Sequence, residues 1–240
     1  MNEAKLIFKR TEKKYLLPAE RYEALWPRIA PYLEPDEYPA STVCSIYYDT
    51  DDFRLIRHSI EGPVYKEKLR LRSYNVPGPD DPVFVELKKK YKGVVYKRRV
   101  CLSARDAEAW LERDEKPAED SQTVREIEWF LRSVGPKAKA YLACDRQAWR
   151  AKQDPELRIT FDRDIRWRET ELELCAGDRG EALLEPGEVL MEIKTPTAAP
   201  IWLARALSEL QIFPVSFSKY GTCYKEHILQ EYIFGGSIHA

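Results

Sequence analysis

The sequence predicts an α+β fold, in which an antiparallel β-barrel or strongly curved sheet carries peripheral helices. Strand-like segments dominate the chain, and few of them alternate with helical segments in the way that a parallel sheet requires. Several segments also place charged residues at every second position with apolar residues between them, which is the period of a strand with two different faces. No clear linker divides the chain, so we predict one domain over residues 1–240.

The expected elements are bounded by Gly, Pro, Ser and Asp residues. Predicted strands lie at residues 4–10, 41–50, 64–74, 82–91, 93–102, 138–150, 156–167, 171–175 and 187–195. Lys92 and Gly93 separate two of them and indicate a hairpin turn. Predicted helices lie at 16–33, 103–133, 199–210 and 218–233. We expect Pro27 to break the first helix, and Ser103 and Ser121 to act as N-caps within 103–133.

The balance of charge excludes some classes of protein. The 39 Lys and Arg residues are matched by 40 Asp and Glu, which argues against a generally basic coat for nucleic acid. No apolar run is long enough to span a bilayer or to form the core of a signal peptide, so we expect a cytoplasmic protein with no membrane insertion. The five cysteines form neither a disulfide framework nor a CxxC metal site, and we expect free, mostly buried thiols at positions 44, 101, 144, 175 and 223.

Alternating cations are the most informative feature of the chain. In "YKEKLRLRSY", residues 65–74, four cations occupy every second position and leave one face of the predicted strand. Four other strands repeat the pattern with the sets Arg10, Glu12 and Lys14; Glu86, Lys88 and Lys90; Arg146 and Arg150; Arg158, Thr160 and Asp162. A further strand carries Glu192 and Lys194.

These charged faces have two interpretations. Half-buried antiparallel strands usually present such a face to solvent. An ordinary outer face mixes Ser, Thr, Gln and both signs of charge, whereas these faces are mainly Arg and Lys. We therefore favour a barrel whose interior gathers about ten cations, an arrangement that a dense polyanion and metal ions would stabilise. Phosphate chains have that chemistry.

The same strands carry eight motifs in a recognisable order: "RTEKKYLL", "SIYYDT", "KLRLRSY", "VELKKK", "DRQAW", "LRITFD", "LMEIKT" and "SFSKYG". Over roughly residues 6–225 the chain resembles the VTC (vacuolar transporter chaperone) polyphosphate polymerase domain of the triphosphate tunnel metalloenzyme, or CYTH-like, superfamily. The resemblance implies an eight-stranded antiparallel tunnel with ATP and polyphosphate as partners and Mn²⁺ or Mg²⁺ as cofactor.

The resemblance also implies roles for individual residues. The basic residues that hold the reacting phosphates are Lys14, Arg70, Arg72, Lys88, Arg146, Arg158 and Lys219. Further substrate contacts are expected from Arg10, Lys68, Arg98, Lys194, Ser218 and Tyr220. Glu192 matches the metal-binding glutamate, and Glu12 and Glu86 are further candidate ligands. The chain departs from the usual ExExK opening because Arg10 replaces the first Glu, which removes one metal-coordinating carboxylate.

Three functions fit these residues. The first is a polymerase that transfers the γ-phosphate of ATP to a growing polyphosphate chain, which needs positioned cations and no side-chain nucleophile. The second is a metal-dependent triphosphatase, in which Glu12 or Glu86 would hold or activate water. The third is a module that binds polyphosphate without catalysis. The sequence has no GxxxxGK[ST] loop, no HExxH and no GxSxG, so any phosphate site is built from side chains on strands.

Overall fold

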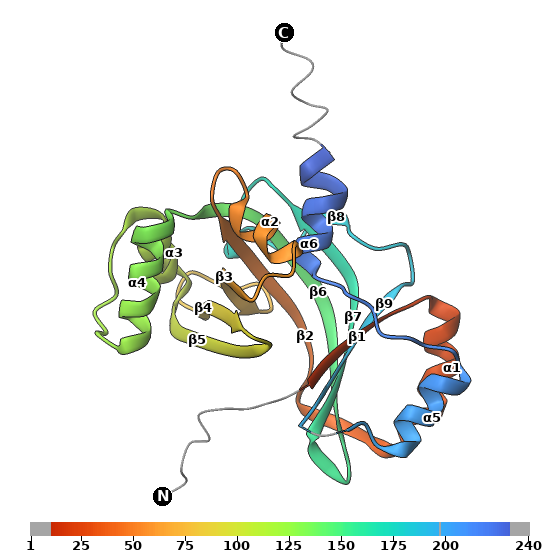
Figure 1. The fold of residues 1–240 in the computed structure, drawn as a ribbon. Helices are drawn as coiled ribbons and strands as arrows, with labels where there is room; N and C mark the ends of the chain where they lie inside the picture. The colour runs from red at the N-terminus through yellow and green to blue at the C-terminus, as the bar shows by residue number, and fades with distance from the viewer. Residues whose placement is uncertain (1–10, 197, 231–240) are drawn as a thin grey trace, which may run out of the picture. The chain divides into compact units, whose positions relative to one another are not determined.

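The computed structural model describes residues 11–196 and 198–230. Within them, strands form an antiparallel sheet in the order β1-β9-β7-β6-β2-β3-β4-β5, and the two-residue strand β8 (Glu181–Ala182) pairs with β7 outside this path (Figure 1). The continuous path has eight strands and ends at β1 and β5. The predicted α+β class and its antiparallel sheet are therefore confirmed.

The described chain divides into two compact units, which share three long strands. Unit 1 comprises residues 11–41, 145–164 and 184–217, and unit 2 comprises 42–144, 165–183 and 218–230. Strands β2 (Leu33–Asp49), β6 (Lys137–Ala151) and β7 (Asp154–Arg168) contribute residues to both. That residues 1–240 act as a single domain stays a prediction.

Unit 1 has a core between its strands and two helices. β1 (Thr11–Leu17) pairs with β9 (Val189–Thr195), which pairs with β7. The apolar residues of these strands pack with α1 (Ala19–Ile29) and α5 (Ile201–Glu209), which lie side by side in Figure 1. The break expected near Pro27 is wrong, because α1 continues to Ile29 before a 3₁₀ turn at Ala30–Tyr32. Proline removes only one backbone donor, and the fully buried Leu25 and Ile29 hold the last turns in place.

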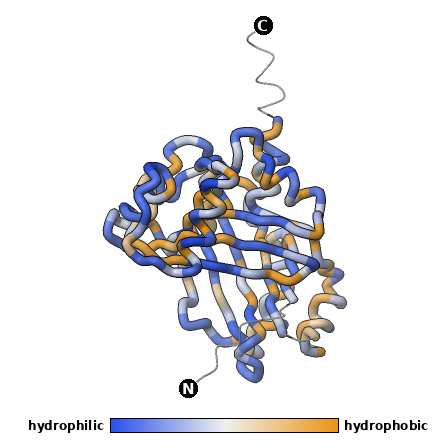
Figure 2. The backbone as a smooth tube through the Cα atoms, turned by 60° about the vertical axis from the view of Figure 1, so that its left-hand side comes forward, coloured by the Kyte–Doolittle hydropathy of each residue, from blue (hydrophilic) through white to orange (hydrophobic). Residues whose placement is uncertain are grey.

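Unit 2 has a second core, again on one face of its strands. β3 (Tyr65–Tyr74), β4 (Pro82–Tyr91) and β5 (Val94–Ser103) are covered by α3 (Ala104–Arg113) and α4 (Gln122–Val134). Leu69, Leu71 and Leu87 are buried against this helical layer. Figure 2 shows hydrophilic and hydrophobic residues alternating along the strands. In both units, helices therefore cover the apolar face of the strands.

Short helices and turns complete unit 2. α2 (Arg54–Ile60) follows β2, and α6 (Lys219–Cys223) continues into a π-helical turn at Tyr224–Ile228. The predicted helix over 103–133 is two helices. Both predicted caps are confirmed, since the Oγ of Ser103 accepts from the N–H of Asp106 and the Oγ of Ser121 from that of Val124.

The predicted strand at 171–175 is wrong. Its backbone forms bends and a 3₁₀ turn at Leu174–Ala176, and Arg168 donates hydrogen bonds to the carbonyls of Glu171, Glu173, Gly177 and Arg179. Arg168 thus binds backbone carbonyl groups that would pair with a neighbouring strand if this segment were itself a strand.

The predicted strand at 4–10 lies outside the described residues. No helix in the described part of the chain is long and apolar enough to cross a membrane.

The β4–β5 hairpin depends on a turn with two left-handed residues. Lys92 has φ 47° and Gly93 has φ 84°, the combination that two-residue hairpin turns require. We expect Gly93→Ala to lower the free energy of unfolding by about 1 kcal/mol, because an added Cβ disfavours this conformation without meeting any neighbour. Lys92→Asn should raise the free energy of unfolding, since Asn tolerates a positive φ better than Lys does. Urea denaturation of both variants checks this, and equal stabilities would contradict it.

Candidate functional site

The register of four strands in unit 2 gathers cations on the face opposite the helices. Residues directly opposite one another in antiparallel strands point to the same side. One row across the strands is Tyr47, Arg70, Glu86 and Arg99. The neighbouring rows bring further cations to this side, which we call the basic face and define as Lys68, Arg70, Arg72, Lys88, Lys97 and Arg99.

Glu86 lies at the centre of the basic face and is 1% exposed. Its Oε2 accepts from Nε and lies 2.6 Å from Nη2 of Arg70, and its Oε1 lies 2.5 Å from Nζ of Lys97. Burial opposes ionisation of this carboxylate, but Arg70, Arg72 and Lys97 outweigh burial and lower its pKa to about 2. Both oxygens are therefore engaged by cations. Glu86 fixes the arginine and the lysine, and this arrangement does not suit the metal-ligand role considered for it.

Like charges lie opposite one another on the same strands. Lys66 faces Lys90, Lys68 faces Lys88, and Lys88 faces Lys97. Burial and the charge of Lys90 lower the pKa of Lys66. Such pairs destabilise a sheet by themselves. An anion bound along the basic face would relieve their repulsion.

The "SKYG" segment meets the basic face from α6. The Oγ of Ser218 lies 3.3 Å from Nζ of Lys68, which donates to it, and it also caps α6 by accepting from the N–H of Gly221. Lys219 is the first residue of α6 and is half-buried. Tyr220 is buried, and its hydroxyl donates to Oδ2 of Asp49 at 3.2 Å. Two of the predicted substrate residues, Ser218 and Lys68, thus meet directly where α6 begins.

Tyr47 is a component of this site that the sequence reasoning missed. Its ring stacks on that of Tyr220, with centroids 4.7 Å apart and an angle of 17° between the planes. Burial opposes ionisation of its hydroxyl, but Arg70, Arg72 and Lys68 lower its pKa to about 8. Its position in the sequence was a usable signal, because Ser45, Tyr47 and Asp49 occupy every second position of the "SIYYDT" strand and so share one face.

Unit 1 holds the other predicted residues, in two groups. In the first, the β1–β9 register places Glu12 opposite Lys194 and Lys14 opposite Glu192. Nζ of Lys14 lies 3.7 Å from Glu12 and 3.4 Å from Glu192, and Nζ of Lys194 lies 4.0 Å and 3.6 Å from the same carboxylates. Lys14 also donates to the carbonyl of Phe217. Two carboxylates and two lysines therefore form a compact charge quartet.

A second group surrounds β7. Arg146 donates to both oxygens of Asp162, at 2.6 Å and 2.7 Å, and Asp162 is fully buried. Nη2 of Arg146 also lies 4.0 Å from Glu192, which links this group to the quartet. Nε of Arg158 lies 3.7 Å from Asp36 and its side chain is half exposed. The alternation of "LRITFD" placed Asp162 on this face, but gave no sign that it would hold Arg146.

The quartet has a donor set that suits a hard divalent cation. In the described parts of the chain, no three or more His, Cys, Asp or Glu side chains are grouped so that they could hold a metal ion by themselves. Mg²⁺ is commonly held by one or two carboxylates together with substrate phosphates and water. Glu12 and Glu192 are two such carboxylates, and both lie within 4.0 Å of the same two lysines. They fit a metal ion whose remaining ligands come from the substrate.

One predicted residue lies on the other face of the sheet, and one is not described. Arg98 faces the helical layer, opposite Leu87, and its Nε lies 3.5 Å from Glu126 of α4. Lys97 and Arg99 occupy the basic face in its place. The two-residue turn at 92–93 fixes this register and could have identified them from the sequence. Arg10 lies outside the described residues.

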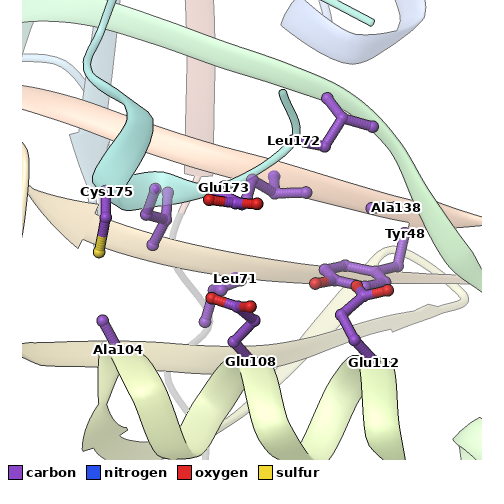
Figure 3. Close-up of a pocket in the computed structure, with 11 residues that line it drawn as sticks. Tyr48, Leu71, Ala104, Glu108, Glu112, Ala138, Leu172, Glu173 and Cys175 are labelled. Carbon is purple, nitrogen blue, oxygen red and sulfur yellow. The ribbon is translucent and has the colours of Figure 1, made fainter. Parts of the chain in front are cut away.

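Unit 2 also contains a cavity of about 180 Å³ on the helix-covered side of its strands, which Figure 3 shows. Leu71 lines it, and the carboxylates of Glu108, Glu112 and Glu173 point toward it. Leu71 and Arg72 are adjacent on a strand and so leave opposite faces. The cavity is separate from the basic face, and its negative charge makes it unsuitable for phosphate.

Comparison with known proteins identifies the family. A family model described as the VTC domain matches residues 9–228. The chain belongs to the VTC domain family. Over 169 residues it is 26% identical to the vacuolar transporter chaperone complex subunit 4 of Trypanosoma cruzi (strain CL Brener), which covers 58% of this chain and 20% of that protein. The VTC-family chain thus spans about a fifth of the length of this relative.

Two solved structures share the fold. One is a protein of Bacillus halodurans proposed to be an adenylate cyclase, with a TM-score of 0.52 and 17% identity over 86% of this chain and 92% of that one. The other is a protein of Hippeastrum proposed to be an adenylyl cyclase, for which a dominant triphosphatase activity is described, with a TM-score of 0.51 and 15% identity over 90% and 94%. The resemblance to the VTC domain that the sequence motifs indicated is confirmed.

The Glu86 carboxylate gives a prediction about stability. Its pKa of about 2 is below the ordinary 4.5, so its ionised form stabilises the fold above about pH 4.5, and this contribution is lost as the pH falls toward 2. We expect Glu86→Gln to lower the free energy of unfolding at neutral pH by roughly 3 kcal/mol. The difference from the unsubstituted chain should shrink in acid.

Urea denaturation at a series of pH values measures this difference. Glu61→Gln is the control, because the side chain of Glu61 is 72% exposed. A Glu86→Gln variant as stable as this control at neutral pH would contradict the prediction.

Proposed function

We propose that this VTC-family chain is a metal-dependent polyphosphate polymerase that transfers the γ-phosphate of ATP to the end of a growing polyphosphate chain. The observation that carries the proposal is the basic face of unit 2, where six cations share one face of the strands with the buried carboxylate of Glu86. Such a surface is suited to a string of closely spaced negative charges. Membership of the VTC domain family and the likeness to a vacuolar transporter chaperone subunit support the choice of polyphosphate.

The cations would act by position and charge. The planar guanidinium groups of Arg70 and Arg72 can each hold two phosphate oxygens at once. Lys68, Lys88 and Lys97 supply point charges. Arg146 and Arg158 of unit 1, with Lys14, would hold further phosphates. Arg146 and Arg70 are held by the buried carboxylates of Asp162 and Glu86. That all these residues line a single tunnel stays a prediction.

The transfer reaction itself needs no side-chain nucleophile. The terminal phosphate of a polyphosphate chain is already ionised, so one of its oxygens can attack the γ-phosphorus of ATP without a strong general base. A new P–O bond forms as the bond to the β-phosphate oxygen breaks, and ADP leaves. Because negative charge is spread over the transferred group, fixed cations can stabilise the transition state.

A divalent ion, Mn²⁺ or Mg²⁺, would be held by Glu192 and Glu12. Bound there, the ion would supply positive charge that neutralises the phosphates. Lys14 and Lys194 lie against the same carboxylates and would be available to phosphate oxygens when the ion takes their place. Glu192 is 7% exposed, so its position is fixed, whereas the side chain of Glu12 is 36% exposed.

Hydrolysis is the second candidate function. Glu12 has a partly exposed carboxylate beside the lysines and could orient a water molecule toward a bound triphosphate. A solved protein of the same fold, from Hippeastrum, is described as a triphosphatase. The third candidate function is binding without turnover, in which the chain holds phosphates but does not release ADP.

One assay distinguishes the three. The purified chain is incubated with ATP and Mn²⁺, and ADP, inorganic phosphate and polyphosphate are separated. ADP with lengthening polyphosphate supports the polymerase, and ADP with stoichiometric phosphate and no polymer identifies the triphosphatase. Binding of ATP without release of ADP identifies the binding module.

Arg72→Ala tests the basic face. We expect it to weaken tripolyphosphate binding by about 1.5–3 kcal/mol, the scale of a lost charge-assisted contact. The matched control is Arg98→Ala, which removes an arginine of β5 from the opposite face of the same sheet. Titration calorimetry measures both affinities. Equal affinities for the two variants would mean that the phosphates bind elsewhere.

Glu192→Gln tests the metal role. Removing a metal ligand should reduce ATP turnover by orders of magnitude while nucleotide still binds to the cations. If Glu192 only neutralised Lys14 and Lys194, the variant would keep its turnover and bind polyanions as well or better. Turnover and ATP affinity are measured together as Mn²⁺ is titrated. Near-normal turnover would exclude the metal role.

A further inference from the structure

Tyr47 places a hydroxyl among the cations of the basic face. It lies directly opposite Arg70 in the β2–β3 register, and its neighbour Ser45, two positions away, accepts a hydrogen bond from Nε of Arg72. The side chain of Tyr47 is hydrogen-bonded to Arg70, and Tyr47 is 9% exposed. An anion bound to Arg70 and Arg72 would therefore meet this hydroxyl.

The carboxylates near this hydroxyl are committed to other partners. Asp49 accepts from the hydroxyl of Tyr220 and from the backbone N–H groups of Leu55 and Ile56 at the start of α2. Glu86 is engaged by Arg70 and by Lys97 of β5. Among the described residues of unit 2, the charged groups that act on Tyr47 are therefore mainly the three cations of β3.

The two stacked tyrosines experience opposite environments. Burial and the carboxylate of Asp49 raise the pKa of Tyr220. Burial also opposes ionisation of Tyr47, but Arg70, Arg72 and Lys68 outweigh it and bring its pKa to about 8. Titratable neighbours whose pKa values are pushed apart in this way are typical of functional sites. Tyr220 stays protonated, and Tyr47 is the member of the pair that can exchange a proton.

We propose that Tyr47 is a phosphate-binding residue whose hydroxyl takes up a proton when a polyanion binds to Arg70 and Arg72. This inference rests on the proposed function of the basic face. In the ligand-free protein, the phenolate that forms as the pH rises through about 8 partly neutralises the two arginines. A bound phosphate supplies that negative charge, and the protonated hydroxyl donates a hydrogen bond to a phosphate oxygen. The proton comes from solvent, and no covalent bond forms or breaks.

The coupling between protonation of Tyr47 and polyanion binding determines how the affinity changes with pH. A phosphate anion cancels the field of the cations, so it raises the pKa of Tyr47 toward or above the ordinary value of 10. Proton uptake then accompanies binding at any pH between the two pKa values. Affinity for a polyanion should therefore fall as the pH rises above about 8, by up to tenfold per pH unit.

Absorbance of tyrosinate in the near ultraviolet tests the ligand-free state. The full chain should show a titration step near pH 8 with the amplitude of about one tyrosine. Saturating tripolyphosphate should move this step above about pH 9. Tyr47→Phe should abolish the step. Tyr48→Phe should retain it, because Tyr48 is the adjacent residue on the opposite face and its pKa is raised by burial and Glu112.

Calorimetry tests the linkage. Tripolyphosphate binding at pH 8 is measured in two buffers of different ionisation enthalpy, which gives the number of protons taken up. The full chain and Tyr48→Phe should take up about half a proton more per bound ligand than Tyr47→Phe, since about half of Tyr47 is ionised at its pKa. Subtracting the proton uptake of one variant from that of the other cancels the protons exchanged by tripolyphosphate itself.

The outcomes separate this inference from the proposed function. If the unsubstituted chain binds no tripolyphosphate, both are overturned. If it binds tripolyphosphate and Tyr47→Phe takes up as many protons as Tyr48→Phe, only the role of Tyr47 is overturned. Should Tyr47→Phe fail to fold, the titration of the unsubstituted chain decides, because the absence of a step below about pH 9 contradicts the inference.

Discussion

The ion cluster around Glu86 is the interaction on which the basic face depends. Arginine and lysine side chains crowded on one face of a sheet repel one another and have many conformations. A buried carboxylate bound to Arg70 and Lys97 holds one cation on each neighbouring strand in a fixed place. In unit 1, Asp162 holds Arg146 in the same way. Each unit thus uses one fully buried acid to orient an arginine before any ligand arrives, which lowers the entropy lost on binding.

The fold could be predicted largely because its strands carry a strict period of two. The apolar sets of β3, β4, β7 and β9 identified the core, and the Lys92–Gly93 turn identified the hairpin. The prediction failed at residues 171–175, where alternating Glu and Leu have the period of a strand. There the backbone partner is Arg168, a side chain from a neighbouring segment, and no local pattern of "ELELC" encodes it.

The site was predicted less completely than the fold, for a related reason. Alternation identifies a face, and so it found Lys68, Arg70, Arg72, Glu86 and Lys88. It does not say which side chains meet across strands, so it gave no sign that Glu86 would bind Arg70 and Lys97 or that Asp162 would bind Arg146. Register supplies that information. The same register excludes Arg98 from the basic face and brings in Lys97.

The position of β5 at the end of the strand order has a consequence for self-association. An edge strand offers unpaired backbone groups to any other strand, and proteins commonly protect such edges with charge. Lys97, Arg98 and Arg99 are consecutive and exposed on this edge. The charges of Lys97 and Arg99 on the basic face, and of Arg98 beside Glu126 on the other face, therefore also repel a second copy of the strand. Removing several of them together would leave an edge open to aggregation.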